Sequence, residues 1–291
     1  MNFNIKDIFR LIRPHQYIKN FFIFLPLFFV GQFGNKELLL NAFMAFVAFS
    51  FVASAIYALN DYKDIEEDRM HPKKKYRPLA SGVISKSQAI IIMTVFFIVG
   101  FGLTLSFSPN ATSIIFAYIL INITYSFYLK HVAIVDVAII AIGFVLRLFI
   151  GSAVTGVPLS MWIVIMTFLL ALFMALAKRR DDVLIYLDTG NEMRKVIHGY
   201  SLKFLDTTIS IMAAVVIVAY ISYTTSSEVL DRVDSEFLYL TAVYVVFGVM
   251  RYLQYIFVFN DSGSPTQIIL KDRFLHFTLI AWALTFAWIL Y

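Results

Sequence analysis

The sequence predicts an all-α, polytopic membrane protein, and three observations lead to this fold class. Of its 291 residues, 60% are hydrophobic and only 15% are charged, whereas charged residues make up about a quarter of a typical soluble domain. The mean hydropathy is +0.79. Apolar runs recur along the chain and approach the roughly 20 residues that a helix needs to cross a bilayer. We therefore expect about nine transmembrane helices.

The predicted spans follow one another at mostly short intervals. The first is the shortest, and it comes directly after a basic, partly polar segment at the N-terminus. Thirty Phe and sixteen Tyr suit side chains that face lipid or lie at its interface with water. The spans are residues 21–33, 38–59, 89–107, 111–129, 133–155, 159–177, 207–225, 237–259 and 274–291.

Lysine and arginine lie almost entirely on one side of this arrangement. If the N-terminus is inside, the outer loops hold only Lys36 and Arg232. Because positive residues accumulate in cytoplasmic loops, we expect the N-terminus and the active-site mouth in the cytoplasm and the C-terminus outside. We expect the inner (plasma) membrane of the cell as location and no nucleic-acid partner, and leave open whether the chain forms a homo-oligomer.

Two cytoplasmic segments, 60–88 and 178–206, are long and charged, whereas several outer connections are tight. Long loops in compact domains are usually functional or disordered. We expect these two to cap one mouth, so that a single integral-membrane domain over residues 1–291 surrounds a central cavity open to the cytoplasmic side. The sequence has no cysteine, which excludes disulfides, zinc–thiolate sites and thiol nucleophiles.

An acidic motif, N-D-x-x-D-x-x-x-D, begins where the second predicted span ends. It consists of Asn60, Asp61, Asp64 and Asp68, and the three carboxylates share one face if the helix continues. Such carboxylates repel one another unless a cation lies among them, and Mg²⁺ is bound by carboxylates together with substrate phosphates. We expect the three aspartates to be catalytic metal ligands for Mg²⁺ and a diphosphate, and Asn60 to bind or position substrate. The alternative is a solvated charge cluster at the interface that pairs with Lys73, Lys74, Lys75 and Arg77.

The basic segment that follows the motif suits the same ligand. Lys73, Lys75 and Arg77 would neutralise the phosphate oxygens that the metal does not reach. A lysine run at the inner leaflet also attracts anionic lipid, by about 1 kcal/mol per residue. The two roles are compatible, and Arg77, fixed between Tyr76 and Pro78, is the strongest candidate for a substrate contact.

A charged residue inside the fifth predicted span is the next candidate. Arg147 lies about three turns into an apolar run and shares a helical face with Gly143 and Asp136. Ionisable residues within a membrane are costly and often mark function, so we expect Arg147 to be catalytic, holding a phosphate or stabilising charge near a sugar. The alternative is an arginine paired with Asp136 or with backbone carbonyls that only fixes packing.

Further cations lie at the cytoplasmic ends of other spans. Lys19 precedes the first span, Lys130 lies at the turn between the fourth and fifth, and Lys178 and Arg179 end the sixth. We expect each to contact a phosphate of a substrate. The alternative for them is a basic side chain that reaches from the helix end to the headgroups.

Several stretches of the chain resemble one family, in the same order. They are IRPHQYIKN, NDYKDIEEDRMHPKKKYRPLASG, YSFYLKHVAIVDV, GFVLRLFIGSAVTGVPLSMW, LFMALAKRRDD and SPTQIILKDRFL. With the acidic motif after the second of nine helices, the chain resembles the UbiA superfamily of intramembrane prenyltransferases over essentially its whole length. Within it, the chain is most similar to the polyprenyl-phosphate phosphoribosyltransferases. The resemblance implies that Tyr125 and Asp136, in the third of these stretches, also bind substrate.

The chain departs from the superfamily at the end of the sixth span. Most members that act on aromatic acceptors carry a second acidic motif, D-x-x-x-D, whereas here Asp181 and Asp182 are adjacent and follow Lys178, Arg179 and Arg180. Cations suit a second substrate that is itself a phosphate. The resemblance therefore implies Mg²⁺-dependent transfer of 5-phosphoribose from 5-phosphoribosyl 1-diphosphate to a polyprenyl phosphate, releasing pyrophosphate, as a precursor step for a cell-envelope glycan.

Two alternatives remain open. One is a prenyltransferase that moves a polyprenyl group from its diphosphate onto an aromatic acceptor, because the first acidic motif serves both reactions. The other is a lipid-phosphate transporter with a charged cytoplasmic gate. The sequence has neither the paired broken helices nor the internal repeat that such transporters often carry, which argues against the second.

Overall fold

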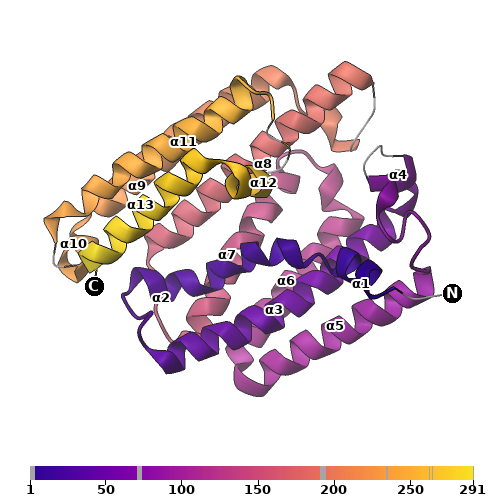
Figure 1. Cartoon of the computed structure of the whole chain (residues 1–291), viewed down its shortest axis with the longest axis horizontal. Coiled ribbons are helices and arrows are strands. Elements are labelled where there is room, and N and C mark those ends of the chain that lie inside the picture. Colours follow the sequence, from indigo (N-terminus) through magenta and orange to yellow (C-terminus); the bar gives the residue numbers. More distant parts are fainter. Residues whose placement is uncertain are drawn as a thin grey trace. The chain divides into compact units, whose positions relative to one another are not determined.

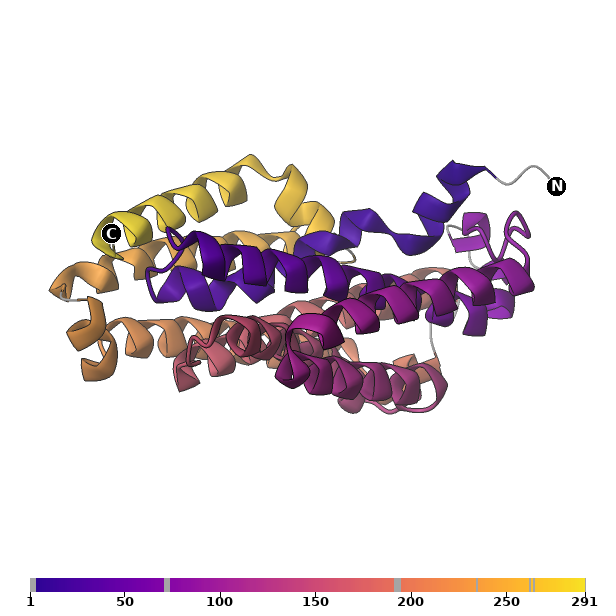
Figure 2. The same ribbon diagram turned by 90° about the horizontal axis from the view of Figure 1, so that it is seen from below.

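The computed structural model describes residues 4–70, 74–190, 195–233, 235–261, 263 and 265–290. Within these ranges every regular element is a helix (Figures 1 and 2). The predicted all-α class is therefore confirmed.

Eight helices in the described part of the chain are long and apolar enough to cross a membrane. They match the second to ninth predicted spans, and the chain is a multi-pass membrane protein. They are α3 (Lys36–Lys63), α5 (Lys86–Phe107), α6 (Pro109–Phe127), α7 (Val135–Thr155), α8 (Met161–Thr189), α9 (Leu202–Thr224), the continuous run Glu236–Phe257 formed by η5 (Glu236–Thr241) and α11 (Ala242–Phe257), and α13 (Arg273–Leu290).

The first predicted span, 21–33, differs from the others. Its residues lie in the 3-10 helix η1 (Pro14–Phe24) and the short helix α2 (Leu25–Phe29), which follow α1 (Ile5–Ile12). No α-helix of spanning length forms there, so the predicted count of nine is not confirmed. Pro14 and Pro26 contribute to this, because proline lacks the N–H group that a helix interior requires.

Most long helices begin at residues that favour a helix start. Asn35 and Ser160 accept backbone N–H groups in the first turns of α3 and α8, and Ser85 forms a capping box with Gln88 at the start of α5. Helix α8 ends at Thr189 and is followed by Gly190, whose φ of 68° is readily adopted by glycine. These local signals set the boundaries of the spans.

The chain divides into two compact units. Unit 1 comprises Met1–Lys130 and Gly143–Leu159, and α3 is its centre, packed against α5, α6 and η1 (Figure 1). Phe49, Ile115 and Ile150 are fully buried in one of its apolar clusters. A Cβ atom added at Gly100 of α5 would lie 2.6 Å from the Ala48 carbonyl oxygen of α3, so the two helices approach so closely that only glycine fits there.

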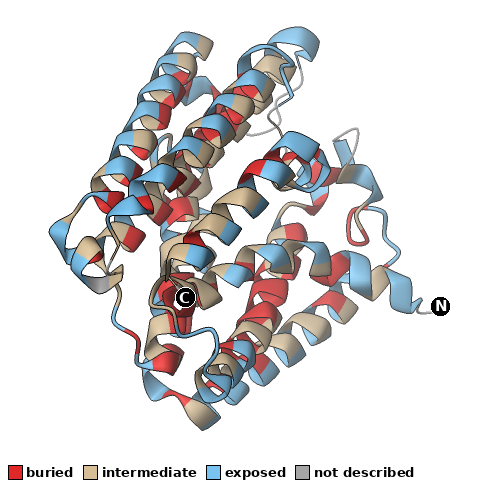
Figure 3. Cartoon of the chain, turned by 60° about the vertical axis from the view of Figure 1, so that its left-hand side comes forward, coloured by how far each residue is buried: buried red, intermediate tan, exposed pale blue. Residues whose placement is uncertain are grey.

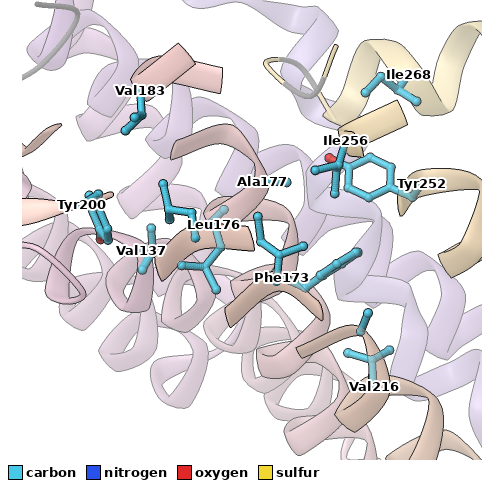
Figure 4. Close-up of a cluster of buried hydrophobic side chains, with 14 of the residues drawn as sticks. Val137, Phe173, Leu176, Ala177, Val183, Tyr200, Val216, Tyr252, Ile256 and Ile268 are labelled. Atoms are coloured by element: carbon cyan, nitrogen blue, oxygen red, sulfur yellow. The ribbon is translucent and has the colours of Figure 1, made fainter. Parts of the chain in front are cut away.

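Unit 2 comprises His131–Ile142 and Ser160–Tyr291. Helix α9 packs against α8 and α11, and α11 against α13. In its core, the rings of Phe173 and Tyr252 meet edge to face with centroids 5.5 Å apart (Figure 4). Asp272 caps α13 by accepting the N–H of Leu275 and also accepts bonds from Arg251. Burial alone would raise the pKa of Asp272, but these hydrogen bonds and the Arg251 charge hold it at about 2.

Each long helix has a buried side and an exposed side, drawn red and blue in Figure 3. On α5 only 11% of the apolar window is buried, although its mean hydropathy is 2.5. Its exposed residues include Ile91 and Ile98. In water such a surface would be unfavourable, and it is accounted for if these side chains face lipid.

The two long charged segments contain short helices between the spans. Segment 60–88 holds α4 (Ile65–Met70) and η2 (Lys74–Tyr76), and segment 178–206 holds η4 (Lys195–Gly199). One transferase domain over the whole chain, with these segments as caps over a central cavity, stays a prediction.

Candidate functional site

The acidic motif lies at a break between two helices. Helix α3 ends at Lys63, Asp64 adopts a turn conformation with φ −97° and ψ 13°, and α4 begins at Ile65. As a result Asp61 and Asp68 are buried, at 2% and 3% exposure, while Asp64 remains partly exposed. Asp61 and Asp68 therefore form a buried pair, and Asp64 is more exposed. The backbone N–H groups of Asp64 and Asp68 still donate to the carbonyls of Asn60 and Asp64, so the helical hydrogen-bond pattern continues through the turn.

Arg77 joins the two buried carboxylates. Its Nη1 atom donates to Asp61 Oδ1 at 3.0 Å and to Asp68 Oδ2 at 2.6 Å. Arg13 forms a second ion pair with Asp61 Oδ1. Two cations and two carboxylates from separate segments of unit 1 thus form one cluster.

The end of α6 and the 3-10 turn that follows it supply the partners of Asn60 and Asp64. Lys130 forms an ion pair with Asp64, and the Ser126 hydroxyl donates to Asn60 Oδ1. Tyr125 lies in the same turn and is half-buried. Of the predicted site residues, the structure therefore brings together Asn60, Asp61, Asp64, Asp68, Arg77 and Lys130 in unit 1.

We tested whether these residues fit the metal that the motif suggests. Within the described ranges, no three His, Cys, Asp or Glu side chains are close enough to hold one ion together. However, Asp61 Oδ2 is buried and accepts no hydrogen bond from any described residue, and Asp61 and Asp68 converge on a single cationic nitrogen. Because Mg²⁺ commonly takes one or two carboxylates and completes its shell with water and phosphate, this pair fits a divalent cation.

Arg147 is buried at 4% exposure among partners in unit 1. Its Nε atom donates to Asn20 Oδ1 at 3.0 Å and its Nη1 atom to the Gly143 carbonyl at 2.5 Å. The guanidinium also lies over the rings of Phe49 and Tyr118, 4.8 and 5.5 Å from their centroids. These contacts match the packing alternative of the sequence analysis, in its carbonyl-satisfied form, and the catalytic role of Arg147 stays a prediction.

A buried ion pair forms around Asp136 in unit 2. Arg179 pairs with Asp136 and donates to Asp182 at 2.9 Å, while the Tyr200 hydroxyl donates to Asp136 at 2.6 Å. Asp136 and Arg179 are 0% and 1% exposed. Burial, together with the Asp136 carboxylate, raises the pKa of Tyr200. Arg179 thus forms ion pairs with two carboxylates of the protein, and its predicted contact with a substrate phosphate stays a prediction.

The remaining predicted site residues are lysines. Lys19 in η1 and Lys178 in α8 are half-buried, and Lys75 is exposed with its ammonium 5.2 Å from the Tyr76 ring centroid. Lys73 lies outside the described residues. Substrate binding by these lysines stays a prediction.

The structure places in these clusters several residues that the sequence does not single out. Arg13 adopts a left-handed φ of 53° directly before Pro14, a strained conformation that often marks a functional position. Asn20, Ser126 and Tyr200 also lie in these clusters, and a single neutral polar residue gives no spacing signal in the sequence. Their partners, Arg147, Asn60 and Asp136, are the charged or motif residues that the sequence does single out.

Two relatives have sequences similar to this one over nearly their whole length. The chain is 30% identical over 288 residues to a decaprenyl-phosphate phosphoribosyltransferase of Mycolicibacterium smegmatis, covering 96% of this chain and 90% of that protein. It is 28% identical over 284 residues to a protein of the same name from Corynebacterium glutamicum, covering 96% of this chain and 85% of that protein.

Solved structures agree in fold. A UbiA homolog from Archaeoglobus fulgidus bound to GPP and Mg²⁺ superposes with a TM-score of 0.71 at 18% identity, covering 97% of this chain and 99% of that one. A sequence profile described as the UbiA prenyltransferase family matches residues 20–278. The helical bundle, the acidic motif after α3 and this match over most of the sequence lead to one conclusion: the chain belongs to the UbiA prenyltransferase family.

Proposed function

We propose that the protein transfers 5-phosphoribose from 5-phosphoribosyl 1-diphosphate to a polyprenyl phosphate and releases pyrophosphate. The observation that carries this proposal is the similarity over 96% of the chain to two proteins named decaprenyl-phosphate phosphoribosyltransferase. The product would be a precursor for a cell-envelope glycan, as the resemblance to these transferases implies. The protein is a membrane-embedded transferase, and the positive-inside pattern supports a cytoplasmic site in the inner membrane.

The donor diphosphate is assigned to unit 1. Asp61, Asp64 and Asp68 would hold Mg²⁺, and the ion would offset the charge that develops on the departing pyrophosphate. Arg77 and Lys130 are already next to these carboxylates and would contact phosphate oxygens of the donor. Asn60, held by Ser126, would orient the donor.

The reaction needs little acid–base chemistry from the protein. The acceptor phosphate is ionised at neutral pH, so one of its oxygens attacks C1 of the ribose without a general base. The bond between C1 and the diphosphate breaks as the new bond forms, and its electron pair leaves on pyrophosphate. The work of the chain is to position both substrates and to stabilise charge.

The end of α8 favours a phosphate acceptor over an aromatic one. Arg179 pairs with Asp182 of α8 and with Asp136 of α7, which makes these carboxylates poorer ligands for a second metal ion. Arg180 pairs with Asp206. Lys178 begins the same cationic run, and we assign it to the acceptor phosphate.

A competing reaction is prenyl transfer onto an aromatic acid. It is supported by similarity, at 27% identity over 57% of the chain, to a 4-hydroxybenzoate octaprenyltransferase of Polynucleobacter asymbioticus. The same diphosphate site would serve a prenyl diphosphate, so the two reactions must be separated by assay.

The test uses purified protein in detergent with Mg²⁺. Radiolabelled 5-phosphoribosyl 1-diphosphate and a polyprenyl phosphate should give a labelled lipid and pyrophosphate. Geranyl diphosphate with 4-hydroxybenzoate should give no prenylated acid. Formation of the prenylated acid without labelled lipid would exclude phosphoribosyl transfer.

Variants link the activity to the proposed metal ligands. Asp61→Asn or Asp64→Asn should lower turnover by at least roughly a hundredfold, because charge stabilisation of this kind typically contributes that much. Glu66→Gln is the matched control, since Glu66 pairs with Arg69 and is exposed. Near-normal turnover in both aspartate variants, with the folded state retained, would contradict the metal role.

A further inference from the structure

Each aspartate of the acidic motif is held by a cation from elsewhere in unit 1. Arg77 lies between Asp61 and Asp68, Arg13 contacts Asp61, and Lys130 contacts Asp64. The aspartates are the residues assigned to Mg²⁺, and the cations are of the kind that binds phosphate. In this structure the aspartates and the cations therefore pair with one another. In a complex with metal and diphosphate, the aspartates would instead face the metal and the cations would face the phosphates.

We propose that Arg13, Arg77 and Lys130 are exchange cations. Before substrate binds they neutralise the three aspartates, and when metal and diphosphate bind together they transfer to phosphate oxygens while the aspartates take the metal. This inference rests on the proposed function, because it assumes that the aspartates hold the metal of the donor diphosphate.

Charge balance makes the exchange of partners favourable only when the metal ion and the diphosphate bind together. Three carboxylates and three cations form a neutral cluster. A divalent ion alone would leave the buried cluster with uncompensated positive charge, and a diphosphate alone would leave it negative. Uncompensated charge in a buried site is costly. The metal–diphosphate complex carries a small net charge. When it binds, the aspartates can pair with the metal and the cations with phosphate oxygens, so that no buried charge is left without a partner.

The contacts leave room for the metal. Asp61 accepts both guanidinium groups on Oδ1, while its Oδ2 accepts no hydrogen bond from any described residue and is buried. One oxygen of this carboxylate is therefore still available for a cation. Asp68 and Asp61 already share one Arg77 nitrogen, which occupies a position suited to a cation that bridges both.

The exchange cations lie where their side chains can move without disturbing a long helix. Arg13 links α1 to η1, Arg77 follows the 3-10 turn η2, and Lys130 lies in the 3-10 turn η3 (Leu129–His131). The side chains of Arg13 and Arg77 are 20% and 27% exposed, whereas Asp61 and Asp68 are 2% and 4% exposed in the same pairs. In the third pair, Lys130 is 13% and Asp64 is 27% exposed. At the buried carboxylates the arginines are therefore the partners nearer to solvent, and neither member of the Lys130–Asp64 pair is fully buried.

The proposal predicts opposite effects of one substitution on two ligands. In Arg77→Gln, the carboxylates lose their competitor, so a divalent metal alone should bind more tightly. The same variant lacks a phosphate contact, so pyrophosphate should bind more weakly when metal is present. Binding of metal and pyrophosphate should be strongly cooperative in the wild type and less so in the variant, and the cooperativity must be equal in both directions.

The test measures binding to the full chain in detergent, with Mn²⁺ as a spectroscopic substitute for Mg²⁺. Free Mn²⁺ is followed by electron paramagnetic resonance, with and without inorganic pyrophosphate. We expect Arg77→Gln to bind Mn²⁺ alone roughly tenfold more tightly than wild type, and pyrophosphate in the presence of Mn²⁺ roughly tenfold more weakly, within the usual range of coupling. Arg69→Gln, which removes an arginine paired with Glu66 outside the motif, should change neither.

A variant of a second cation keeps the test informative if Arg77→Gln does not fold. Lys130→Gln acts on Asp64 rather than on the buried pair, and it should shift both affinities in the same directions. If neither variant tightens Mn²⁺ binding while Asp61→Asn weakens it, the exchange is wrong and the metal site stands. If Asp61→Asn also leaves Mn²⁺ binding unchanged, the metal site of the proposed function is itself wrong.

Discussion

At the scale of single residues, burial distinguishes the two charged clusters. Asp61 and Asp68 of the acidic motif are buried, but the arginines that pair with them are partly exposed. In unit 2, Asp136 and Arg179 are both almost fully buried. A buried pair is strongly destabilising when one partner is removed, because the other charge remains uncompensated. The cluster around Asp61 and Asp68 can therefore exchange partners, whereas the ion pair between Asp136 and Arg179 is expected to stay intact.

This difference predicts how unit 2 responds to loss of the Arg179 charge. Arg179→Met should lower the free energy of unfolding by about 3–5 kcal/mol, because Asp136 would keep only the Tyr200 hydrogen bond. The double variant Asp136→Leu with Arg179→Met should recover much of that loss. Denaturation of the purified protein in detergent measures both.

Lys203→Met provides the control, because Lys203 is exposed near the start of α9. It should leave the stability within about 0.5 kcal/mol of wild type, as surface substitutions usually do. If Arg179→Met were as stable as the wild type, the Asp136–Arg179 ion pair would not be needed for the stability of unit 2.

At the scale of elements, η1 and α2 run beside α3 from one end to the other. Arg13 meets Asp61 near the C-terminal end of α3, Asn20 donates to Ser50 in its middle, and Leu27 packs against Ala42 near its N-terminal end. Arg147 fixes this segment by bonding to Asn20. The segment therefore follows the full apolar length of α3 although it contains no long α-helix.

Close approach of α3 and α5 predicts a large effect at one glycine. Gly100→Ala should destabilise the protein by about 1–3 kcal/mol, because the added methyl group meets the Ala48 carbonyl and the Val52 side chain. The change would appear as a lower midpoint of thermal denaturation in detergent.

Gly102 is the matched control on the same helix. A Cβ atom there meets nothing within 4 Å, and alanine favours a helix over glycine by up to about 1 kcal/mol. Gly102→Ala should thus be neutral or slightly stabilising. Equal effects at both positions would mean that helix propensity, rather than the contact between α3 and α5, decides the outcome.

At the scale of the whole molecule, the path of the first segment decides on which side the N-terminus lies. Eleven residues of η1 at about 2.0 Å and five of α2 at about 1.5 Å rise by roughly 30 Å, which is the thickness of the hydrocarbon core. A 3-10 helix is longer per residue than an α-helix, so this short segment reaches as far as a span. We predict that it crosses the membrane and that the N-terminus is cytoplasmic.

The absence of cysteine in the sequence makes this prediction easy to test. Single variants Gly34→Cys, Asn4→Cys and Glu67→Cys place one thiol in the predicted outer loop, near the N-terminus and near the acidic motif. In intact cells a membrane-impermeant maleimide should label only Gly34→Cys, and the other two should react after permeabilisation. Labelling of Asn4→Cys in intact cells would mean that the first segment does not cross.

The sequence by itself determined the architecture and the kind of site. Apolar runs predicted the eight long helices because a bilayer fixes their length and composition, and the caps at Asn35 and Ser85 are local signals. The acidic motif and its basic neighbour were visible because charged residues are rare in this chain. Asp61, Asp68 and Arg77 could be grouped correctly because they lie within one short segment.

Only the tertiary structure decided which charges are partners. Arg13 is 48 residues from Asp61, Lys130 is 66 from Asp64 and Arg179 is 43 from Asp136, and no helical period relates such separations. Spacing placed Asp64 on one face with Asp61 and Asp68, but it could not show that Asp64 pairs with Lys130 while the other two pair with Arg77. Periodicity is set by the backbone of one helix, whereas pairing depends on how separate helices pack, and that is decided by the whole chain.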